Sequence, residues 1–469
     1  MRSSESDQPS DRLRLAALLG LVAASFLLGG ASRNDVIQLV VLQPIAVICL
    51  GIFLISPGAV RWNAIRVPLG LLAAIAGLAA VQLVPLPPAI WASLPGHGQF
   101  TSSAQVIGLE APWRPLSLVP DLTLSSLVGL IVPLAALIGF ASVSEQRTRL
   151  LLPCLLLGAT LSALLGLAQL AGGAGSPLYL FSITNAGSPV GFFSNRNHQA
   201  ALLVITWPML ALWASTASES RLKDLRQMRR WIAGALAILL LPMILVIGSR
   251  AGVVLGVIGL AAAAVLWRHP SGRERLRDKL ALPIFAVSAG AVLLAAVLLS
   301  RDEAVQRITG MDSDSEGRLE YLPTLLKMAG DFFPIGSGFG GFDPLYRVYE
   351  PHEYLSPSYL NHAHNELMEL AIQGGLPGLI ILAVFLFWLA ARGWAVFRGQ
   401  SGTARDFGRL GFFMVTMLLL ASLVDYPLRT PLLGAVFAIA TGWLSGYGSS
   451  ERPAGTARAG EKSLPNSSL

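Results

Sequence analysis

Charged residues are scarce in this sequence. Asp, Glu, Lys and Arg together make up 13% of its 469 residues, and hydrophobic residues make up 54%. Soluble domains normally carry about 25% charged residues, so the composition excludes an ordinary soluble globular domain. Apolar runs of the length that a bilayer requires, about 17 to 25 residues, recur along the chain. The sequence therefore predicts an all-α polytopic integral membrane protein.

Cysteine is also nearly absent, with only 2 residues in the chain. Cys49 and Cys154 both fall inside predicted membrane spans. This placement argues against a disulfide framework and against a metal cluster built on cysteine. We interpret both residues as small apolar groups that fill space between helices.

The apolar runs predict about twelve membrane-spanning helices. The first follows a short N-terminal tail, residues 1–12, and is interpreted as an uncleaved signal anchor because no A-x-A cleavage site follows it. A multi-span domain then covers residues 13–447, and the polar tail at 448–469 is expected to be disordered. The predicted spans lie near residues 13–31, 36–55, 67–86, 122–142, 150–172, 199–217, 231–248, 251–267, 281–300, 375–391, 410–424 and 431–447.

The distribution of charge predicts the orientation in the membrane. If the N-terminus is cytoplasmic, most of the 34 Lys and Arg residues fall in inner loops, whereas Asp and Glu favour the outer loops. An excess of Lys and Arg is typical of the cytoplasmic side, so both termini are predicted to be cytoplasmic. The net charge of +7 then needs no nucleic acid as a partner. Basic loops such as 221–230 and 268–279 are expected to meet anionic membrane lipids.

Unusual polar residues gather on the predicted outer side. The largest outer loop covers residues 301–374, with helical stretches expected at 319–328 and 361–372. Five polar motifs lie in the outer loops and turns, and they are Gly191–His198, Ser249–Arg250, Gly317–Arg318, His362–Asn365 and Asp425–Arg429. Motifs that are distant in sequence but share one side of the membrane are candidates for one site.

Two arginines are candidate anion-binding residues. Arg250 separates two predicted spans, where a charge is costly unless the side chain reaches the interface. Its guanidinium stays charged at any working pH, and its planar fork suits phosphate oxygens. Arg318 could equally be an ordinary loop residue that pairs with Glu316 or Glu320.

His364 is the candidate general base. An imidazole titrates near neutrality, so it can take and return a proton at the working pH. Glu366 and Glu369 follow within two helical turns, and a carboxylate there could orient the ring. His362 is a competing candidate, because it precedes Glu366 by four residues and could pair with it.

Asn195 and Asn197 precede a predicted span and have two interpretations. Asn is common in turns and at helix N-caps, so both could simply satisfy backbone groups. They could equally contact a ligand.

Two further patterns are set aside. Gly336, Gly338 and Gly341 spell G-x-G-x-x-G, but no βαβ unit surrounds them and the predicted side is wrong for cytosolic nucleotides. The acidic stretch 312–316 lacks the Gly and the distal Glu of an EF-hand loop.

The motifs and their order resemble those of the O-antigen ligase and O-antigen polymerase family of bacterial envelope enzymes. The resemblance runs over roughly residues 150–445. It rests on the segments Gly191–Asn197, Ser249–Gly252, Gly317–Arg318, Gly336–Phe342, His364–Leu367, Gly375–Gly378 and Asp425–Pro431. One departure is Leu322, where members of the family often have an aromatic residue four positions after the loop arginine.

The resemblance implies a glycosyltransferase at the periplasmic face of the bacterial inner membrane, acting without a metal or a tightly bound cofactor. The donor would be a glycan on undecaprenyl pyrophosphate. The acceptor would be a hydroxyl of a lipid A-core sugar, of another carrier-linked glycan or of a protein. Polysaccharide assembly proteins are further candidate partners. The glycan, the acceptor and the choice between ligase and polymerase stay open.

The resemblance also implies roles for individual residues. Arg250 and Arg318 would bind the pyrophosphate, and His364 would activate the acceptor hydroxyl. The residues expected to position sugar or phosphate are Asn195, Asn197 and Arg429.

Two other classes of function were weighed against transfer chemistry. A secondary transporter often has a similar number of spans, but it usually places ionisable residues or broken helices near the bilayer midplane. The predicted spans contain no clear residue of that kind. A non-catalytic component of a polysaccharide export system is the third class, and the intact set of arginines and histidine argues against it.

Overall fold

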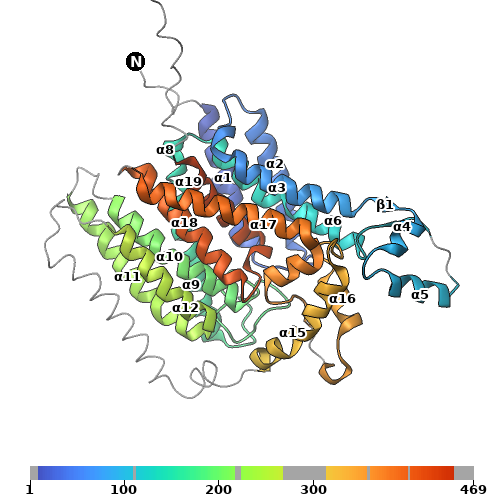
Figure 1. The fold of residues 1–469 in the computed structure, drawn as a ribbon. Coiled ribbons are helices and arrows are strands. Elements are labelled where there is room, and N and C mark those ends of the chain that lie inside the picture. The colour runs from blue at the N-terminus through green and yellow to red at the C-terminus, as the bar shows by residue number, and fades with distance from the viewer. Residues whose placement is uncertain are drawn as a thin grey trace, which may run out of the picture.

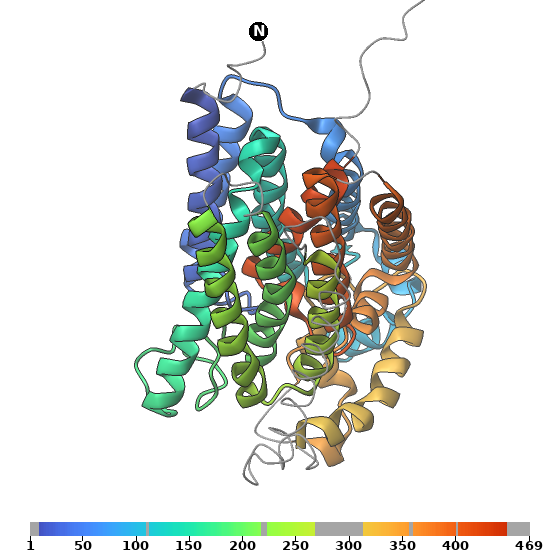
Figure 2. The same ribbon diagram turned by 90° about the vertical axis from the view of Figure 1, so that its left-hand side faces the viewer.

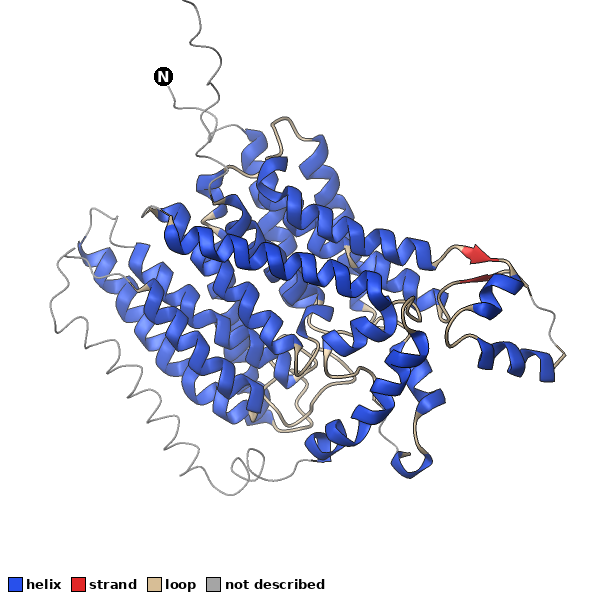
Figure 3. Ribbon diagram, in the orientation of Figure 1, coloured by secondary structure: helices blue, strands red, loops and turns tan. Residues whose placement is uncertain are grey.

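The computed structural model describes residues 9–108, 112–216, 223–267, 313–355, 360–399 and 402–447. Regular structure in these ranges is almost entirely helical (Figure 3). The only sheet in the same ranges is an antiparallel pair, in which β1 (Pro85–Leu86) pairs with β2 (Arg114–Pro115). The prediction of a helical protein is therefore confirmed.

The helices follow the apolar runs of the sequence. In chain order they are α1 (Pro9–Leu28), α2 (Gln38–Ile55), α3 (Trp62–Gln82), α4 (Pro88–Ser93), α5 (Gly98–Val106), α6 (Pro120–Gly129), α7 (Ile131–Ser142), α8 (Glu145–Thr148), α9 (Leu151–Gly172), α10 (Arg196–Thr216), α11 (Lys223–Ile247), α12 (Arg250–Leu266), α15 (Ser313–Phe332), α16 (Phe342–Tyr349), η3 (His352–Tyr354), α17 (Glu366–Arg398), α18 (Thr403–Ser422), η4 (Pro427–Arg429) and α19 (Pro431–Gly446).

Seven helical stretches of the described chain are long and apolar enough to cross a membrane, and α12 and α19 are shorter apolar helices. The predicted spans at 13–31 and 410–424 are the helices α1 and α18. Neither is among the seven, because each carries three charged residues in its first turns. The predicted span at 281–300 lies outside the described residues, as do residues 1–8 and the tail from 448. The count of about twelve spans stays a prediction.

Several boundaries differ from those predicted. α3 ends at Gln82 rather than near residue 86, because Pro85 and Leu86 pair with the strand β2. The two stretches expected at 361–372 and 375–391 form one longer helix, α17, which begins only at Glu366 and is interrupted at Gly375, where φ is 56°. The break between α11 and α12 is as predicted, since Gly248 adopts a φ of 69° there.

Helix α10 is the centre of the bundle. Protein surrounds 89% of its apolar stretch, compared with 22% for α2 and for α3. It packs against α9, α11, α12 and α18. A Cβ added to Gly259 of α12 would lie 2.7 Å from the carbonyl oxygen of Val204 on α10, so the two helix backbones approach closely. Small residues at such a crossing are typical of membrane helix pairs.

Most of the long helices run between two ends of the bundle (Figures 1 and 2), and these ends carry different residues. We call one the histidine end, defined by the segments 195–198, 361–369 and 425–430. The opposite one, the arginine end, carries Arg14, Arg61, Arg392 and Arg405. Helices α4 and α5 and the strand pair project beside the bundle in Figure 1.

The histidine end brings together polar motifs that were predicted to share one side of the membrane. Helix α18 ends at the histidine end and α19 begins there. Both helices run between the two ends of the bundle. The assignment of this end to the outer side of the membrane stays a prediction.

Candidate active site

Several helices begin at the histidine end and are capped there by side chains. Ser249 accepts a hydrogen bond from the backbone N–H of Gly252 at 3.0 Å, which begins α12. Asn365 does the same for α17, accepting from Met368 N at 3.0 Å. Thr430 begins α19 in this way. A helix N-terminus carries unpaired N–H groups and a partial positive charge, so this end of the bundle favours anions.

His364 lies directly before the cap of α17. Its φ is 47°, and it is the only non-glycine residue with a positive φ in the described chain. Such backbone conformations are costly and cluster at functional sites. The ring Nδ1 lies 3.2 Å from Oδ1 of Asp425, which follows α18 in sequence. The His364 side chain is 22% exposed, so one edge of the imidazole remains accessible.

The charge state of Asp425 determines how the His364 ring presents its nitrogens. Burial alone would raise the pKa of this carboxyl. The hydrogen bond and the charge of His364, together with a hydrogen bond from Asn197, outweigh burial and hold the Asp425 pKa well below its usual value. The side chain is therefore a carboxylate and can only accept a hydrogen bond. It follows that His364 Nδ1 donates, and that Nε2 carries the free lone pair.

A second histidine at this end has a different environment. Nδ1 of His362 lies 3.0 Å from Oε1 of Glu369, which is fully buried. The Glu369 carboxylate also lies 3.1 Å from the Arg429 guanidinium and accepts from Gln373 Nε2 at 3.1 Å. A further hydrogen bond comes from Ala363 N. This carboxylate is saturated with partners, so His362 belongs to a structural network.

The glycine-rich loop at 336–342 supports this network. Gly340 N donates to Oε1 of Gln373 at 3.2 Å. Gly336 has a φ of 88°, and a Cβ there would lie 2.5 Å from the Gln373 carbonyl oxygen. Glycine is needed here for backbone conformation and for close approach. The loop therefore holds Gln373, beside Glu369, and the rejection of a dinucleotide fingerprint is consistent with this geometry.

Tyr426 lies between the histidines. The centroid of its ring is 4.2 Å from that of His362, 4.9 Å from that of His364 and 5.1 Å from that of His198. Its hydroxyl accepts from Asn195 Nδ2 at 3.4 Å. Burial, and then the Asp425 charge, raise the pKa of this phenol. Tyr426 is therefore uncharged and lines the site between the histidines.

A small cavity adjoins the His364–Asp425 pair. It has a volume of about 10 Å³, which is roughly the space of one water molecule. Among the residues that line it are Asn197, His198, Ser249 and Asp425. His198 is completely buried, and neither of its ring nitrogens has a hydrogen-bond partner among the described residues. This buried imidazole faces a polar cavity behind the carboxylate that orients His364.

The structure places the predicted site residues unevenly. Arg250 is the first residue of α12, directly after the cavity-lining Ser249, and its side chain is exposed. Arg318 falls on α15, but its side chain lies outside the described part of the structure. Arg429 pairs with Glu369 at 3.1 Å, so its charge compensates the buried carboxylate of that network.

Asn195 has the turn role of one predicted interpretation, and contact of either asparagine with a ligand stays a prediction. Asn195 accepts a hydrogen bond from the backbone of Asn197 at 2.8 Å, as in a turn before a helix. Its amide nitrogen also reaches Tyr426, and Asn197 lines the cavity next to Asp425. Both therefore lie at the candidate site.

Two sequence-based pairings are wrong. The carboxylate that orients His364 is Asp425, and it is not Glu366 or Glu369. His362 pairs with Glu369 rather than with Glu366. The reason is the cap at residue 365, because the helix starts after it and carries both glutamates away from His364, which turns towards α18.

Some residues of the site were not singled out from the sequence. Asp425 and Tyr426 were visible as part of a polar turn after an apolar run, but nothing in the sequence pairs them with a histidine. His198 could have been noticed as a histidine at the start of an apolar span. The role of Gln373 had no sequence signal.

Positive groups at this end of the described chain include Arg250 and the N-termini of the helices that begin there. No three His, Cys, Asp or Glu side chains there lie in an arrangement that could hold a metal ion. Phosphate could be bound by Arg250 and by the helix N-termini beside it.

Part of the chain matches a known family. Residues 235–383 match the family model described as O-antigen ligase. The matched segment contains Arg250, Arg318 and His364 but ends before Asp425. This match confirms the predicted resemblance and supports a membrane glycosyltransferase of the O-antigen ligase or polymerase type. No curated protein is matched by the chain.

Proposed function

We propose that the chain moves a glycan from undecaprenyl pyrophosphate to an acceptor hydroxyl at the outer face of the bacterial inner membrane. In this proposal the histidine end is the active site, and the reaction uses no metal. The acceptor is a sugar hydroxyl, as in O-antigen ligases and polymerases.

The contact between His364 and Asp425 carries the proposal. An ionised Asp425 fixes the tautomer in which Nδ1 is protonated, so Nε2 is free to accept a proton. The accessible edge of the ring belongs to a residue in the segment that matches the O-antigen ligase family. Geometry and family resemblance thus point to the same imidazole as the base.

The reaction balances with the groups at this end. The acceptor hydroxyl gives its proton to Nε2 of His364, and its oxygen forms a bond to the anomeric carbon. The bond between that carbon and the pyrophosphate oxygen breaks, and the electron pair leaves with the carrier pyrophosphate. Negative charge therefore grows on phosphate oxygens as the transition state forms.

Arg250 and Arg318 would stabilise this growing charge. A guanidinium that binds the leaving group more strongly in the transition state than in the ground state accelerates the reaction. The N-termini of α10, α12, α17 and α19 add partial positive charge at the same end. The Arg429–Glu369 pair would act as a positioning element, because it holds the start of α17 against η4.

The proposal is tested by glycan analysis of a deletion strain complemented with the wild-type chain or with His364→Ala. Carrier-linked glycan, lipopolysaccharide-bound glycan and free polymer would be compared at equal levels of membrane-inserted protein. We expect the variant to behave as the deletion does. Accumulation of single repeat units would identify a polymerase, and accumulation of long carrier-linked chains would identify a ligase.

His362→Ala is the matched control for the base assignment. It removes an imidazole from the same segment, so its loss of transfer should follow its loss of folded protein. Full transfer by His364→Ala at normal membrane levels would contradict the base assignment. Unchanged glycan pools in the deletion strain would contradict glycan transfer altogether.

A further inference from the structure

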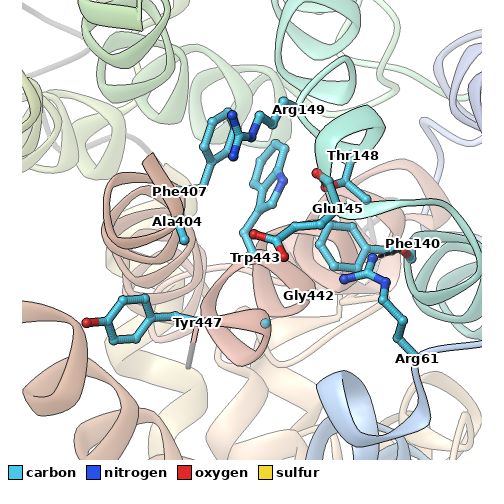
Figure 4. A pocket seen from close by; sticks show the side chains of 11 residues that line it. Arg61, Phe140, Glu145, Thr148, Arg149, Ala404, Phe407, Gly442, Trp443 and Tyr447 are labelled. Carbon is cyan, nitrogen blue, oxygen red and sulfur yellow. Dashed lines mark hydrogen bonds between the residues drawn. The ribbon is translucent and has the colours of Figure 1, made fainter. Parts of the chain in front are cut away.

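A recess at the arginine end is lined by three charged side chains that form no salt bridge with each other. It is lined by residues from α7, α8, α18 and α19 and by Arg61 (Figure 4). Glu145 and Arg149 both line it, and they are four residues apart on one stretch of chain. Residues so spaced in a helical stretch often form an ion pair. Neither side chain has a hydrogen bond or a salt bridge within the described ranges, although the Glu145 carboxylate lies close enough to the Arg61 guanidinium to interact with its charge.

The walls of the recess are aromatic. Phe407 and Trp443 lie with ring centroids 5.4 Å apart, and Phe140 and Tyr447 complete the lining. Trp443 is 4% exposed, and its indole Nε1 has no acceptor among the described residues. A buried indole N–H normally finds a partner, so this one indicates that an acceptor belongs here.

One more cation faces the recess. Arg61 donates through one nitrogen to the carbonyl oxygens of Phe140 and Val143, both at 2.9 Å. These bonds fix the guanidinium at the edge of the recess, as Figure 4 shows for Phe140. The recess therefore presents two guanidinium groups, one indole donor and one carboxylate. A ligand that fits all four has an anionic part and a cationic part.

The position of the recess indicates where such a ligand comes from. Arg149 directly precedes α9, a helix of a stretch that is long and apolar enough to cross a membrane. Leu150, Leu157, Leu161 and Leu164 are exposed apolar residues on α9 or at its start. Their spacing places them on one face of the helix, which begins just after Arg149 of the recess.

We propose that this recess binds the headgroup of an aminophospholipid, with the phosphate at Arg149 and Arg61 and the ammonium at Glu145. The acyl chains lie along the exposed leucines of α9. An anionic lipid without an ammonium group would leave Glu145 unpaired beside another negative charge. The site is distinct from the histidine end, and the inference does not depend on the proposed transfer reaction.

The test measures lipid-dependent thermal unfolding of the purified full chain in detergent. Phosphatidylethanolamine, phosphatidylglycerol and phosphatidylcholine with identical acyl chains are added at equal concentration. We expect phosphatidylethanolamine to raise Tm most, because only its ammonium has N–H groups for Glu145. Free phosphoethanolamine should give a smaller shift, because it lacks the acyl chains. Equal shifts with the three lipids, or a full shift with free phosphoethanolamine, would overturn the proposal.

Variants assign the selectivity to named residues. Glu145→Gln should lose the preference for phosphatidylethanolamine, with its affinity falling about two- to five-fold, as expected for a partly exposed ion pair. Arg149→Gln should weaken binding of all three lipids. Arg66→Gln is the matched control, because Arg66 is exposed on the first turns of α3 and does not line the recess. Native mass spectrometry of bound lipid provides a second readout if a variant is less stable. A Glu145→Gln protein that keeps the preference would refute the assignment.

Discussion

Arg429 at the histidine end and Arg14 at the arginine end are both held by oxygen atoms, but the oxygens differ in kind. Arg429 pairs with the buried carboxylate of Glu369 at 3.1 Å. Arg14 donates to the backbone carbonyls of Ser142 at 3.0 Å and Gly58 at 2.7 Å, and also to that of Ser56. Its side chain is buried without any carboxylate contact in the described ranges.

The other arginines of the arginine end repeat the pattern of Arg14. Arg392 donates to carbonyls at the end of α19, including that of Leu444 at 3.0 Å. Arg405 donates to the Gly399 carbonyl, just after α17. The last carbonyls of a helix lack partners within the helix and carry partial negative charge, so a guanidinium stabilises them. Arg14, Arg392 and Arg405 thus bind carbonyls at helix ends, whereas Arg429 binds an ionisable group.

The comparison teaches that the same side chain has consequences of different kinds at the two ends. A carbonyl does not titrate, so Arg14, Arg392 and Arg405 contribute to folding independently of pH. Arg147 near the same end differs from them, because it pairs with Asp11 at 3.3 Å. A carboxylate and an imidazole do titrate, so changes at the histidine end alter proton positions and hence chemistry. Each prediction below tests this difference.

The largest effect is expected for Asp425→Asn. The amide could donate to His364 Nδ1 and so place the ring proton on Nε2, where it blocks proton acceptance. We expect glycan transfer to fall by about 10²- to 10⁴-fold, the range for general-base catalysis. Transfer would be measured with purified protein and carrier-linked glycan. Arg405→Gln is the control at the arginine end, and it should leave transfer per folded molecule unchanged.

The same variant gives a pH test. The pKa of Asp425 is depressed in the folded chain, so this carboxylate stabilises the fold above its unfolded pKa, near 3.9. That stabilisation is lost as pH falls through the folded value. The difference in Tm between wild type and Asp425→Asn should therefore be constant from about pH 6 to 8 and shrink below about pH 4. A difference that grows on acidification would contradict the assigned direction.

The next largest effect is expected for Arg429→Met. The substitution leaves the buried Glu369 without its cation, which typically costs about 3–5 kcal/mol of stability. Unfolding in a denaturing detergent titration would measure this loss. Adding Glu369→Gln should restore part of it, because the uncompensated charge is then gone. If the double variant is less stable than Arg429→Met, the pair is not the source of the effect.

Arg14→Met should have a smaller effect on stability. Three carbonyls lose a charged donor, and hydrogen bonds to charged groups contribute about 1.5–3 kcal/mol each at most, less where water can replace them. We expect a net loss of about 1–3 kcal/mol that is the same at pH 5 and pH 8. A loss that varies strongly with pH would break the contrast between the two ends.

The smallest effect is expected for His198→Phe. The ring nitrogens have no partners among the described residues, so an apolar ring of similar shape should leave Tm nearly unchanged. Transfer should fall by less than about tenfold, below the range of a lost general base. A loss as large as that of Asp425→Asn would show that His198 has a direct part in the reaction.

The sequence predicted much of the fold because apolar length and charge placement act locally. The break between α11 and α12 follows from Ser249 and Arg250, which cannot sit deep in a bilayer at low cost. The end of α3 was misplaced because the pairing of β1 with β2 joins segments that are almost thirty residues apart. No local pattern encodes that contact.

The sequence predicted which residues belong to the site better than it predicted which of them contact each other. Motif chemistry identified His364 and the polar turn at 425–429, and the structure places them in contact. The pairing of His364 with Asp425 depends on how α17 packs against α18, and on the unusual φ of His364. Both are tertiary effects, so helical spacing pointed to the wrong carboxylates.

The sequence separation of His364 and Asp425 also bears on biosynthesis. A ribosome completes His364 well before it completes Asp425, and α17 and α18 lie between the two. Until residue 425 has been synthesised, the imidazole therefore lacks the carboxylate that sets its tautomer. Only when α18 has entered the bilayer and η4 has folded back does the pair form. On the proposed mechanism, a chain that ends before Asp425 would lack transfer activity, and the site would be completed only with the α18–α19 hairpin.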